Sequence, residues 1–304
     1  YVLYFSGDAI ATLSATDAYS GVDKTYLSVN GKTFIPSDGM KFSEEGFYQL
    51  RHYAVDRVGN TSEPLQTRFY IDKTPPVTNL EMVNATKNIF GPKSTLSIPS
   101  QDTISGVHVT YYNWNSGEFK RSYKNRILFE GVKEGANILQ FYTEDLVGNT
   151  EGIHKVTLSF DKNGPEVSHE IKGDKYIEDG KVYLSSRSQI VLKAVDEMVD
   201  IQSIEYQVNG LSYGNYEISF RPPVQTGEFK MDYQGIDIIG NKSILASANF
   251  VVDSQSPTTR LITDGVTYRR GPNVIWVNTK TRISLKALDA VSGVKSIFYK
   301  FNKK

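Results

Sequence analysis

AVDRVGN, at residues 54–60, returns as TEDLVGN at residues 143–149 and as GIDIIGN at residues 235–241. The aspartates of these stretches are 89 and 92 residues apart. A period of about 90 residues is the length of one small β-sandwich domain, and such a period indicates a tandem array. The stretch therefore predicts the architecture of the chain. No catalytic motif lies beside it.

A second motif begins with an aspartate upstream of each stretch. Its four copies begin at Asp17, Asp102, Asp196 and Asp289, and each reaches an asparagine thirteen residues later. Tyr112 and Trp114, ten and twelve residues after Asp102, share one face of a strand, which predicts a core-facing pair. The whole chain reads as short alternating segments rich in Tyr, Val, Ile and Thr, separated by Gly, Asn, Asp and Ser. This pattern predicts an all-β protein.

Composition excludes several classes of protein. The chain has 304 residues, with 34 basic and 34 acidic side chains and no cysteine. A net charge of zero argues against a general grip on nucleic acid or on anionic membranes. The lack of cysteine excludes disulfides, thiolate catalysis and cysteine-ligated zinc. Apolar runs are far shorter than the roughly 20 residues that a membrane-spanning helix needs. A cysteine-free repeat chain is typical of exported bacterial proteins.

A third motif predicts the domain boundaries. Residues 72–76, 161–165 and 253–257 each begin with Asp and end with Pro, which terminates a strand and stiffens the chain. The predicted domains are 1–76, 77–165, 166–257 and 258–304. The first lacks its opening strand and the last stops before its own Asp-x-x-Gly-Asn stretch, so we expect a window on a longer array. The short linkers predict domains that abut.

These motifs resemble bacterial immunoglobulin-like repeats, in particular those of leptospiral and other Gram-negative surface and outer-membrane proteins. The fullest match lies at residues 17–22, 54–60 and 71–76, whereas the later repeats depart from the pattern at Val199-Asp200 and at Gly164. The resemblance implies tandem immunoglobulin-like β-sandwiches of about seven strands and about 90 residues each. It also implies a place on or outside the cell envelope.

The Asp-x-x-Gly-Asn stretch has a mechanical and a chemical interpretation. The aspartate can accept hydrogen bonds from the N–H groups that follow it, and Gly and Asn tolerate positive φ, so the stretch predicts a tight turn. Alternatively, the aspartates of loops and linkers meet at the domain joints and bind Ca²⁺ through carboxylate oxygens. The candidate ligands are Asp72, Asp102 and Asp145 at the first joint, Asp161, Asp196 and Asp237 at the second, and Asp253 and Asp289 at the third.

Other conspicuous side chains are interpreted structurally. His52 takes the place held by Phe141 in the next repeat, so we expect it to be half-buried in the core. We expect Trp114 and Trp276 to be buried or half-buried, and Glu44-Glu45 and Glu228 to be solvated. The histidines have no metal-binding spacing. No phosphate loop or nucleophile motif occurs, which favours a protein that is not an enzyme.

The sequence thus predicts a non-enzymatic, extracytoplasmic structural or adhesive rod on a bacterial surface or secreted from it. Its partners would be other modules of the same chain or envelope assembly, or further copies joined through exposed sheet edges, for example in a filament. One alternative is a spacer in a secreted or surface enzyme whose catalytic domain lies outside these residues. Another is an adhesin that binds host matrix or carbohydrate directly.

Overall fold

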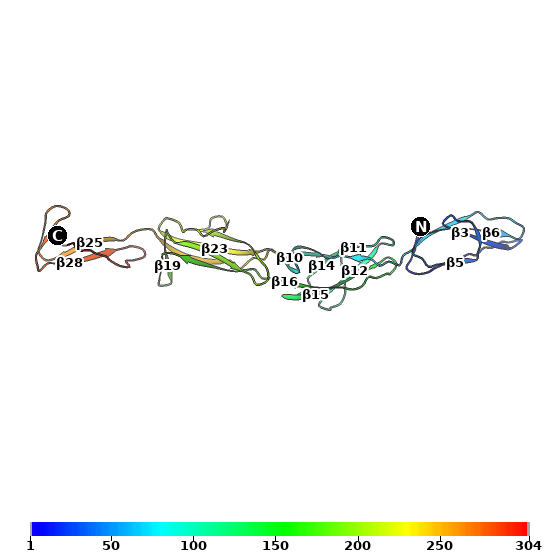
Figure 1. Cartoon of the computed structure of the whole chain (residues 1–304), viewed down its shortest axis with the longest axis horizontal. Coiled ribbons are helices and arrows are strands. Elements are labelled where there is room, and N and C mark those ends of the chain that lie inside the picture. Colours follow the sequence, from blue (N-terminus) through cyan, green and yellow to red (C-terminus); the bar gives the residue numbers. More distant parts are fainter. Residues whose placement is uncertain (1, 303–304) are drawn as a thin grey trace. The chain divides into compact units, whose positions relative to one another are not determined.

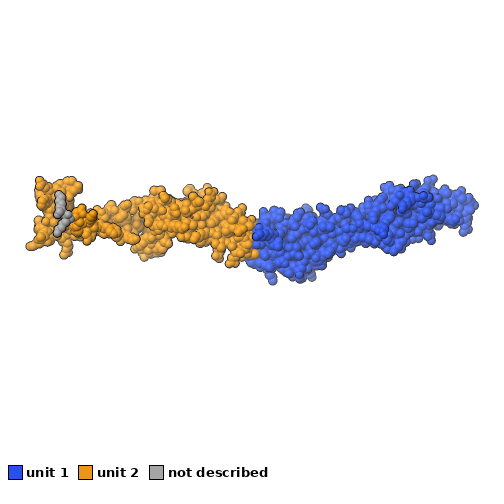
Figure 2. Space-filling model, in the orientation of Figure 1, with its two compact units in different colours: residues 1–162 blue, residues 163–304 orange. Residues whose placement is uncertain are grey.

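The computed structural model describes residues 2–302, in which every regular element is a β-strand (Figure 1). The chain divides into two compact units, residues 1–162 and residues 163–304 (Figure 2). Each sheet is made of strands from a single predicted repeat. The all-β fold class is therefore confirmed, whereas the division into four domains stays a prediction. No helix among residues 2–302 is long and apolar enough to cross a membrane.

The first repeat, residues 1–76, is a sandwich of a five-stranded and a two-stranded sheet. Its strands are β1 (Leu3–Phe5), β2 (Ala9–Thr12), β3 (Val22–Val29), β4 (Ile35–Pro36), β5 (Gly39–Phe42), β6 (Gly46–Asp56) and β7 (Leu65–Ile71). The larger sheet has the order β1-β7-β6-β3-β4, and β2 pairs with β5. Alternate residues face the core, where Leu27 and Leu50 of the larger sheet meet Ala9 and Phe42 of the smaller one. His52 is half-buried, as predicted.

The second repeat, residues 77–165, has the same two layers. Its strands are β8 (Val77–Thr78), β9 (Glu81–Thr86), β10 (Ile89–Ser97), β11 (Ser100–Gln101), β12 (Val107–Trp114), β13 (Lys120–Arg121), β14 (Arg126–Ile127), β15 (Gly135–Asp145) and β16 (His154–Phe160). The main sheet has the order β13-β12-β15-β16-β10-β14, and β8 pairs with β11. Trp114 is buried and stacks on Phe90 at 5.6 Å between ring centroids, which confirms its place in the core.

The third repeat, residues 166–257, repeats the plan. Its strands are β17 (Glu166–Lys172), β18 (Lys175–Glu178), β19 (Lys181–Ser185), β20 (Gln189–Val195), β21 (Ile201–Val208), β22 (Gly214–Asn215), β23 (Gly227–Asp237) and β24 (Ala246–Asp253). The six-stranded sheet runs β18-β19-β24-β23-β21-β22 and packs against the β17-β20 pair. Leu192, Met231, Phe250 and Val252 lie in its core.

The fourth repeat, residues 258–304, contains two separate strand pairs. They are β25 (Thr258–Asp264) with β28 (Arg282–Leu288), and β26 (Thr267–Arg269) with β27 (Ile275–Val277). Trp276 lies on β27 with 59% of its surface exposed, so the prediction that it is buried or half-buried is wrong. Within the described part of the chain β26 and β27 pair only with each other, and five of their six residues are exposed.

The repeated motifs occupy the same structural places in the first three repeats. The strands β6, β15 and β23 each run for eleven residues from a glycine to the aspartate of the Asp-x-x-Gly-Asn stretch. Each pairs with the strand of the upstream motif (β3, β12 or β21). The asparagines that end those strands have positive φ, 52° at Asn30, 54° at Asn115 and 50° at Asn209. Turn chemistry predicted from sequence therefore sets where these strands end.

Candidate functional site

The Asp-x-x-Gly-Asn stretch forms a closed turn. Asp145 Oδ1 accepts hydrogen bonds from the N–H groups of Val147 at 2.9 Å and Asn149 at 2.8 Å. Asp56 and Asp237 make the same two contacts in their own repeats. Gly148 supplies the positive φ, 91°, that the turn requires. The mechanical interpretation of the stretch is therefore confirmed.

The first joint, residues 72–76, is held to the second repeat by Asp72. Its Oδ2 accepts a hydrogen bond from the N–H of Ser105 at 2.8 Å, and its main-chain oxygen accepts one from Asn149 Nδ2 at 2.9 Å. Its Oδ1 accepts the N–H of Thr74 at 3.1 Å. Asp72 is fully buried. One linker residue thus contacts both of the loops that the sequence singled out.

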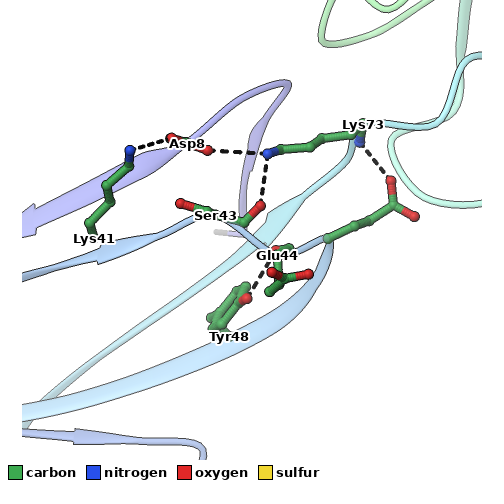
Figure 3. A network of polar contacts seen from close by, with 7 residues as sticks. Asp8, Lys41, Ser43, Glu44, Tyr48 and Lys73 are labelled. Carbon is green, nitrogen blue, oxygen red and sulfur yellow. Dashed lines mark hydrogen bonds and ion pairs between the residues drawn. The ribbon is translucent and has the colours of Figure 1, made fainter.

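The same joint is held to the first repeat by Glu45 and Asp8, and Figure 3 shows Asp8 and Ser43 beside Lys73. Glu45 accepts hydrogen bonds from the N–H of Lys73 at 2.7 Å and from the hydroxyl of Thr74 at 2.8 Å. Lys73 Nζ donates to Asp8 at 3.1 Å and to the main-chain oxygen of Ser43 at 2.7 Å. We call Glu45, Asp8, Lys73 and Thr74 the linker clasp. Glu45 is exposed, as predicted, and in addition it accepts the hydrogen bonds of the linker, which the sequence did not predict.

The clasp carboxylates have lowered pKa values. Hydrogen bonds from Lys73 and Thr74 hold the pKa of Glu45 below its ordinary value. The side chains of Lys41 and Lys73 lower the pKa of Asp8 to about 2. Both groups are therefore ionised at neutral pH, where they hold the linker through charge-assisted contacts.

An equivalent contact occurs at the other linkers. The N–H of Lys162 donates to Glu134 Oε2 at 3.2 Å, and that of Ser254 donates to Thr226 Oγ1 at 3.2 Å. Glu45, Glu134 and Thr226 all directly precede the glycine that begins the long central strand. Sequence reasoning missed this position, although a hydrogen-bond acceptor recurring before that glycine was a usable signal.

Three acids meet at the first joint. One carboxylate oxygen from each of Asp72, Asp102 and Asp145 lies within 4.8 Å of the others. Asp72 and Asp145 are buried, at 0% and 1% exposed, and Asp102 is half-buried. The structure thus brings together the residues predicted for this joint, in an all-oxygen group of the kind that holds hard cations.

The other predicted ligands are placed as follows. At the third joint, Asp253 Oδ2 accepts the N–H of Ser292 at 3.1 Å, as Asp72 does with Ser105. Burial raises the pKa of Asp253, but hydrogen bonds from Ser292 and Gln255 outweigh it, so its pKa lies below the ordinary value. Asp289 Oδ1 accepts the N–H groups of its own loop, including that of Ser292 at 3.0 Å.

The predicted ligands of the second joint belong to different compact units. Asp161 lies in residues 1–162, where its N–H donates to the main-chain oxygen of Phe90 at 2.9 Å. Asp196 and Asp237 lie in residues 163–304. Asp196 Oδ1 accepts the N–H of Met198 at 2.8 Å, so it caps its own loop. That these three acids share a cation stays a prediction.

A chain of hydroxyls lies in the second repeat next to its acidic group. Thr78 and Thr143 are 2.6 Å apart at their Oγ1 atoms, Thr143 and Thr110 are 2.8 Å apart, and Thr110 Oγ1 lies 3.0 Å from Ser100 Oγ. Glu151 Oε2 accepts the N–H of Thr78 at 3.1 Å. The threonines are almost fully buried. The sequence did not single out any of these residues.

No protein-family model matches the chain, and no curated protein matches it. Solved structures that resemble it include the fibronectin(III)-like modules of Clostridium thermocellum CbhA, at 15% identity over 53% of this chain and 88% of that chain, with a TM-score of 0.32. A structure described for host cell surface retention of a 1.5-MDa bacterial ice-binding adhesin is 12% identical over 84% of this chain and 94% of that chain, with a TM-score of 0.34. A tetra-tandem repeat in the extending region of a large adhesion protein is 10% identical over 94% of this chain and 87% of that chain, with a TM-score of 0.24.

At these identities and TM-scores the likenesses carry no argument about function. The fold rests on the strands and sheets described above. The more specific resemblance to leptospiral repeats stays a prediction.

Proposed function

We propose that this chain is a non-enzymatic, extracytoplasmic spacer, whose immunoglobulin-like domains present or assemble other modules of a surface protein. The observation that supports it is the first joint. Three consecutive linker residues, Asp72, Lys73 and Thr74, are hydrogen-bonded to the repeats on both sides. A flexible tether would leave these groups in water. A clasped linker fixes the orientation of one domain on the next, which is what a spacer needs.

The contacts at the first joint differ in how much they stabilise it. A hydrogen bond to a charged group is worth roughly 1.5–3 kcal/mol when it is shielded from water, and much less when exposed. The contacts of Asp72 are buried, whereas those of Glu45 and Asp8 are at the surface. Asp72 therefore contributes most to the order of the joint, and the linker clasp sets the direction in which the linker leaves the first repeat.

Spin labels can test this proposal on the 304-residue chain. One label on the first repeat and one on the second should give a single narrow distance distribution by pulsed electron resonance. The double variant Asp72→Ala, Glu45→Ala should broaden it. The matched control Glu228→Ala alters an exposed acid two residues past Thr226, the clasp position of the third repeat, and should leave the distribution narrow. A broad distribution for the unaltered chain would contradict the proposal.

A direct adhesive role is a second candidate, favoured by an aromatic cluster on the outer face of the first repeat. Tyr26 and Tyr53 stack with ring centroids 5.0 Å apart, and Phe34 meets Tyr53 edge-on at 4.9 Å. The guanidinium of Arg51 lies 5.9 Å from the centroid of the Phe34 ring. Tyrosine and arginine are enriched at surfaces that bind partners.

The second repeat carries the same aromatic cluster, and the third does not. Its members in the second repeat are Tyr111, Tyr142 and Phe119. The third repeat has Glu205 and Gln234 at the two stacked positions, joined by a hydrogen bond of 2.7 Å. Binding to immobilised matrix proteins and glycans should then fall for Tyr53→Ser with Tyr142→Ser. Unchanged binding, or none by the unaltered chain, would remove this candidate.

The proposal includes a location on a bacterial surface or outer membrane. The alternative to it is a spacer in a secreted or surface enzyme whose catalytic domain lies elsewhere. The edge strands differ in what they offer to another copy. The strands β4, β13 and β22 have two residues each, whereas β17, which is paired only with β20 among the described strands, has seven. Lateral assembly through sheet edges therefore stays an alternative to partners among the other modules of the same surface assembly.

A further inference from the structure

We propose that Asp72, Asp102 and Asp145 bind one hard divalent cation of the calcium class at the first joint. The proposal goes beyond the spacer function, because the linker can be held by its hydrogen bonds whether or not a cation is present. The first observation that supports it is where the three carboxylates lie. The three carboxylates come from a linker and two loops that are far apart in the sequence, yet an oxygen from each lies within 4.8 Å of the others.

The charge of this group calls for a counter-charge. Asp72 and Asp145 are almost fully buried, and burying an ionised carboxylate is costly unless it is paired. None of the ion pairs formed within residues 2–302 involves any of the three acids. Backbone N–H groups offset part of the cost but carry no net charge. A bound cation would supply the rest.

The hydrogen bonds leave oxygens available. Both bonds to Asp102 fall on Oδ1, from Ile104 N at 3.1 Å and Gly106 N at 2.6 Å. Within residues 2–302, Asp145 Oδ2 accepts one hydrogen bond, from Asn149 Nδ2 at 2.7 Å. A carboxylate oxygen can accept two contacts, so each acid can hold its own turn and still present an oxygen to a cation.

Ser105 is an independent observation that points to a ligand. It is 8% exposed, and its hydroxyl oxygen is buried with no hydrogen-bond partner within the described residues. Its N–H lies 2.8 Å from Asp72 Oδ2, which places the residue at the acidic group. The equivalent hydroxyl in the first repeat, on Ser20, reaches the carboxylate of Asp17 at 3.2 Å. A buried hydroxyl is rarely left without a partner, and its oxygen would complete the group as a further cation ligand.

The donor set selects the class of cation. All four side chains offer oxygen, and the chain contains no cysteine. Ca²⁺ accepts six to eight oxygens in flexible geometry, whereas Mg²⁺ demands near-ideal octahedral geometry and keeps several waters. Asp102 is half-buried, so water can reach the group and fill the remaining positions. A calcium-class ion fits such a group better than Mg²⁺ does.

The test uses the 304-residue chain stripped of metal, followed by Trp114 fluorescence, because that buried side chain reports on the second repeat. Calcium should raise the melting temperature of this transition, and magnesium at the same concentration should raise it less. Asp102→Asn keeps the Oδ1 acceptor of its loop but removes a charge, and should lower calcium affinity about tenfold or more in calorimetry. Asp17→Asn, in the same kind of loop with no linker aspartate described beside it, should leave affinity unchanged.

The variant Ser105→Ala distinguishes a loss of calcium binding from a loss of folding. This change removes a hydroxyl without a partner, so the metal-free protein should be at least as stable as the unaltered chain, while its calcium shift should shrink. The proposal is overturned if calcium gives no heat and no shift, or if Asp102→Asn binds as the unaltered chain does. The spacer proposal is tested separately, by the distance distribution in the absence of calcium.

Discussion

The second and third repeats share a fold but fill four equivalent positions with opposite chemistry. The positions are Thr78, Ser100, Thr110 and Thr143 in the second repeat, and Val167, Ala194, Ile204 and Gly235 in the third. The pairing is the same in both: the first residue of each set faces the second across one ladder, and the third faces the fourth across another. The second repeat joins its four hydroxyls in one hydrogen-bonded chain, whereas the third packs apolar groups.

The comparison teaches that each set works only as a whole. A buried hydroxyl needs its partner, since leaving it unpaired costs roughly 1–3 kcal/mol, whereas replacing all partners by apolar groups can be nearly neutral. In the third repeat the space is already filled. A Cβ on Gly235 would lie 2.9 Å from Val167 Cγ1 and 3.4 Å from Ala194 Cβ. Neither set therefore accepts a single residue from the other.

Gly235→Thr should have the largest effect, because it places one hydroxyl residue of the second repeat into the apolar set of the third. Overpacking and an unpaired hydroxyl together should lower the free energy of unfolding by about 3 kcal/mol. Hydrogen exchange of the β23 amides would measure the loss. Adding Val167→Ala should restore part of it by making room. Unchanged protection in the single variant would show that the two sets can mix.

Thr143→Val should have the next largest effect, because Thr143 is the member of the hydroxyl chain that contacts both Thr78 and Thr110. Both neighbours would lose a hydrogen bond at constant side-chain shape, at a cost of about 2 kcal/mol. Denaturant unfolding followed by Trp114 fluorescence would report the change. The surface variant Thr157→Val, on β16 of the same repeat, serves as the control and should cost little. Equal stability for both variants would contradict the importance of the chain.

Replacing the whole hydroxyl set by the apolar set should cost less than Thr143→Val alone. The quadruple variant Thr78→Val, Ser100→Ala, Thr110→Ile, Thr143→Gly leaves no hydroxyl of this chain unpaired. Its free energy of unfolding should lie within about 1 kcal/mol of the unaltered protein, by the same Trp114 measurement. A loss equal to the sum of four single losses would mean that the hydroxyls contribute independently.

Acidification should have the smallest effect on stability, and it should affect the linker contact at the first joint but not the equivalent contact at the third. The pKa values of Glu45 and Asp8 lie below their ordinary values of 4.5 and 3.8, and that of Asp8 is about 2. A lowered pKa means that the contribution to stability is present above the ordinary pKa and is lost as the pH falls through the lowered one. The amide resonance of Lys73 should therefore shift between about pH 4.5 and pH 2.

The third joint provides the comparison for this titration. Thr226, the equivalent acceptor there, has no charge to lose, so the amide of Ser254 should report no titration of its acceptor. In Glu45→Gln the Lys73 shift should shrink, and stability should fall by less than about 1 kcal/mol, because the clasp is at the surface. Identical titrations of the two amides would contradict the role given to Glu45.

Local interactions made much of the fold predictable. The turn at Asp145 closes within five residues, so its hydrogen bonds follow from the order of Asp, Gly and Asn alone. The central strand β15 follows from alternation between a glycine and that turn. The sequence also predicted that Asp72 meets Asp102 and Asp145. The two loops that carry Asp102 and Asp145 lie, in an immunoglobulin-like sandwich, at the end of the domain where the preceding linker enters.

Contacts between distant residues could not be predicted in this way. Glu45 and Lys73 are 28 positions apart, and no pattern shows that the linker turns back onto that side chain. Trp276 lies at a core position of the alternating apolar pattern, but this pattern shows only on which face of the strand a side chain lies. Whether another sheet covers that face depends on strands elsewhere.

The sequence by itself determined the 90-residue period, the strands, the tight turns and the linkers, because each arises from neighbouring residues through alternation, positive φ or the ring of proline. Only the tertiary structure decided that four hydroxyls form a chain, that a glutamate clasps the linker and that a buried serine lies beside the three acids. Those contacts join segments tens of residues apart. Their formation depends on which loops the packed sheets bring to the same end of a domain.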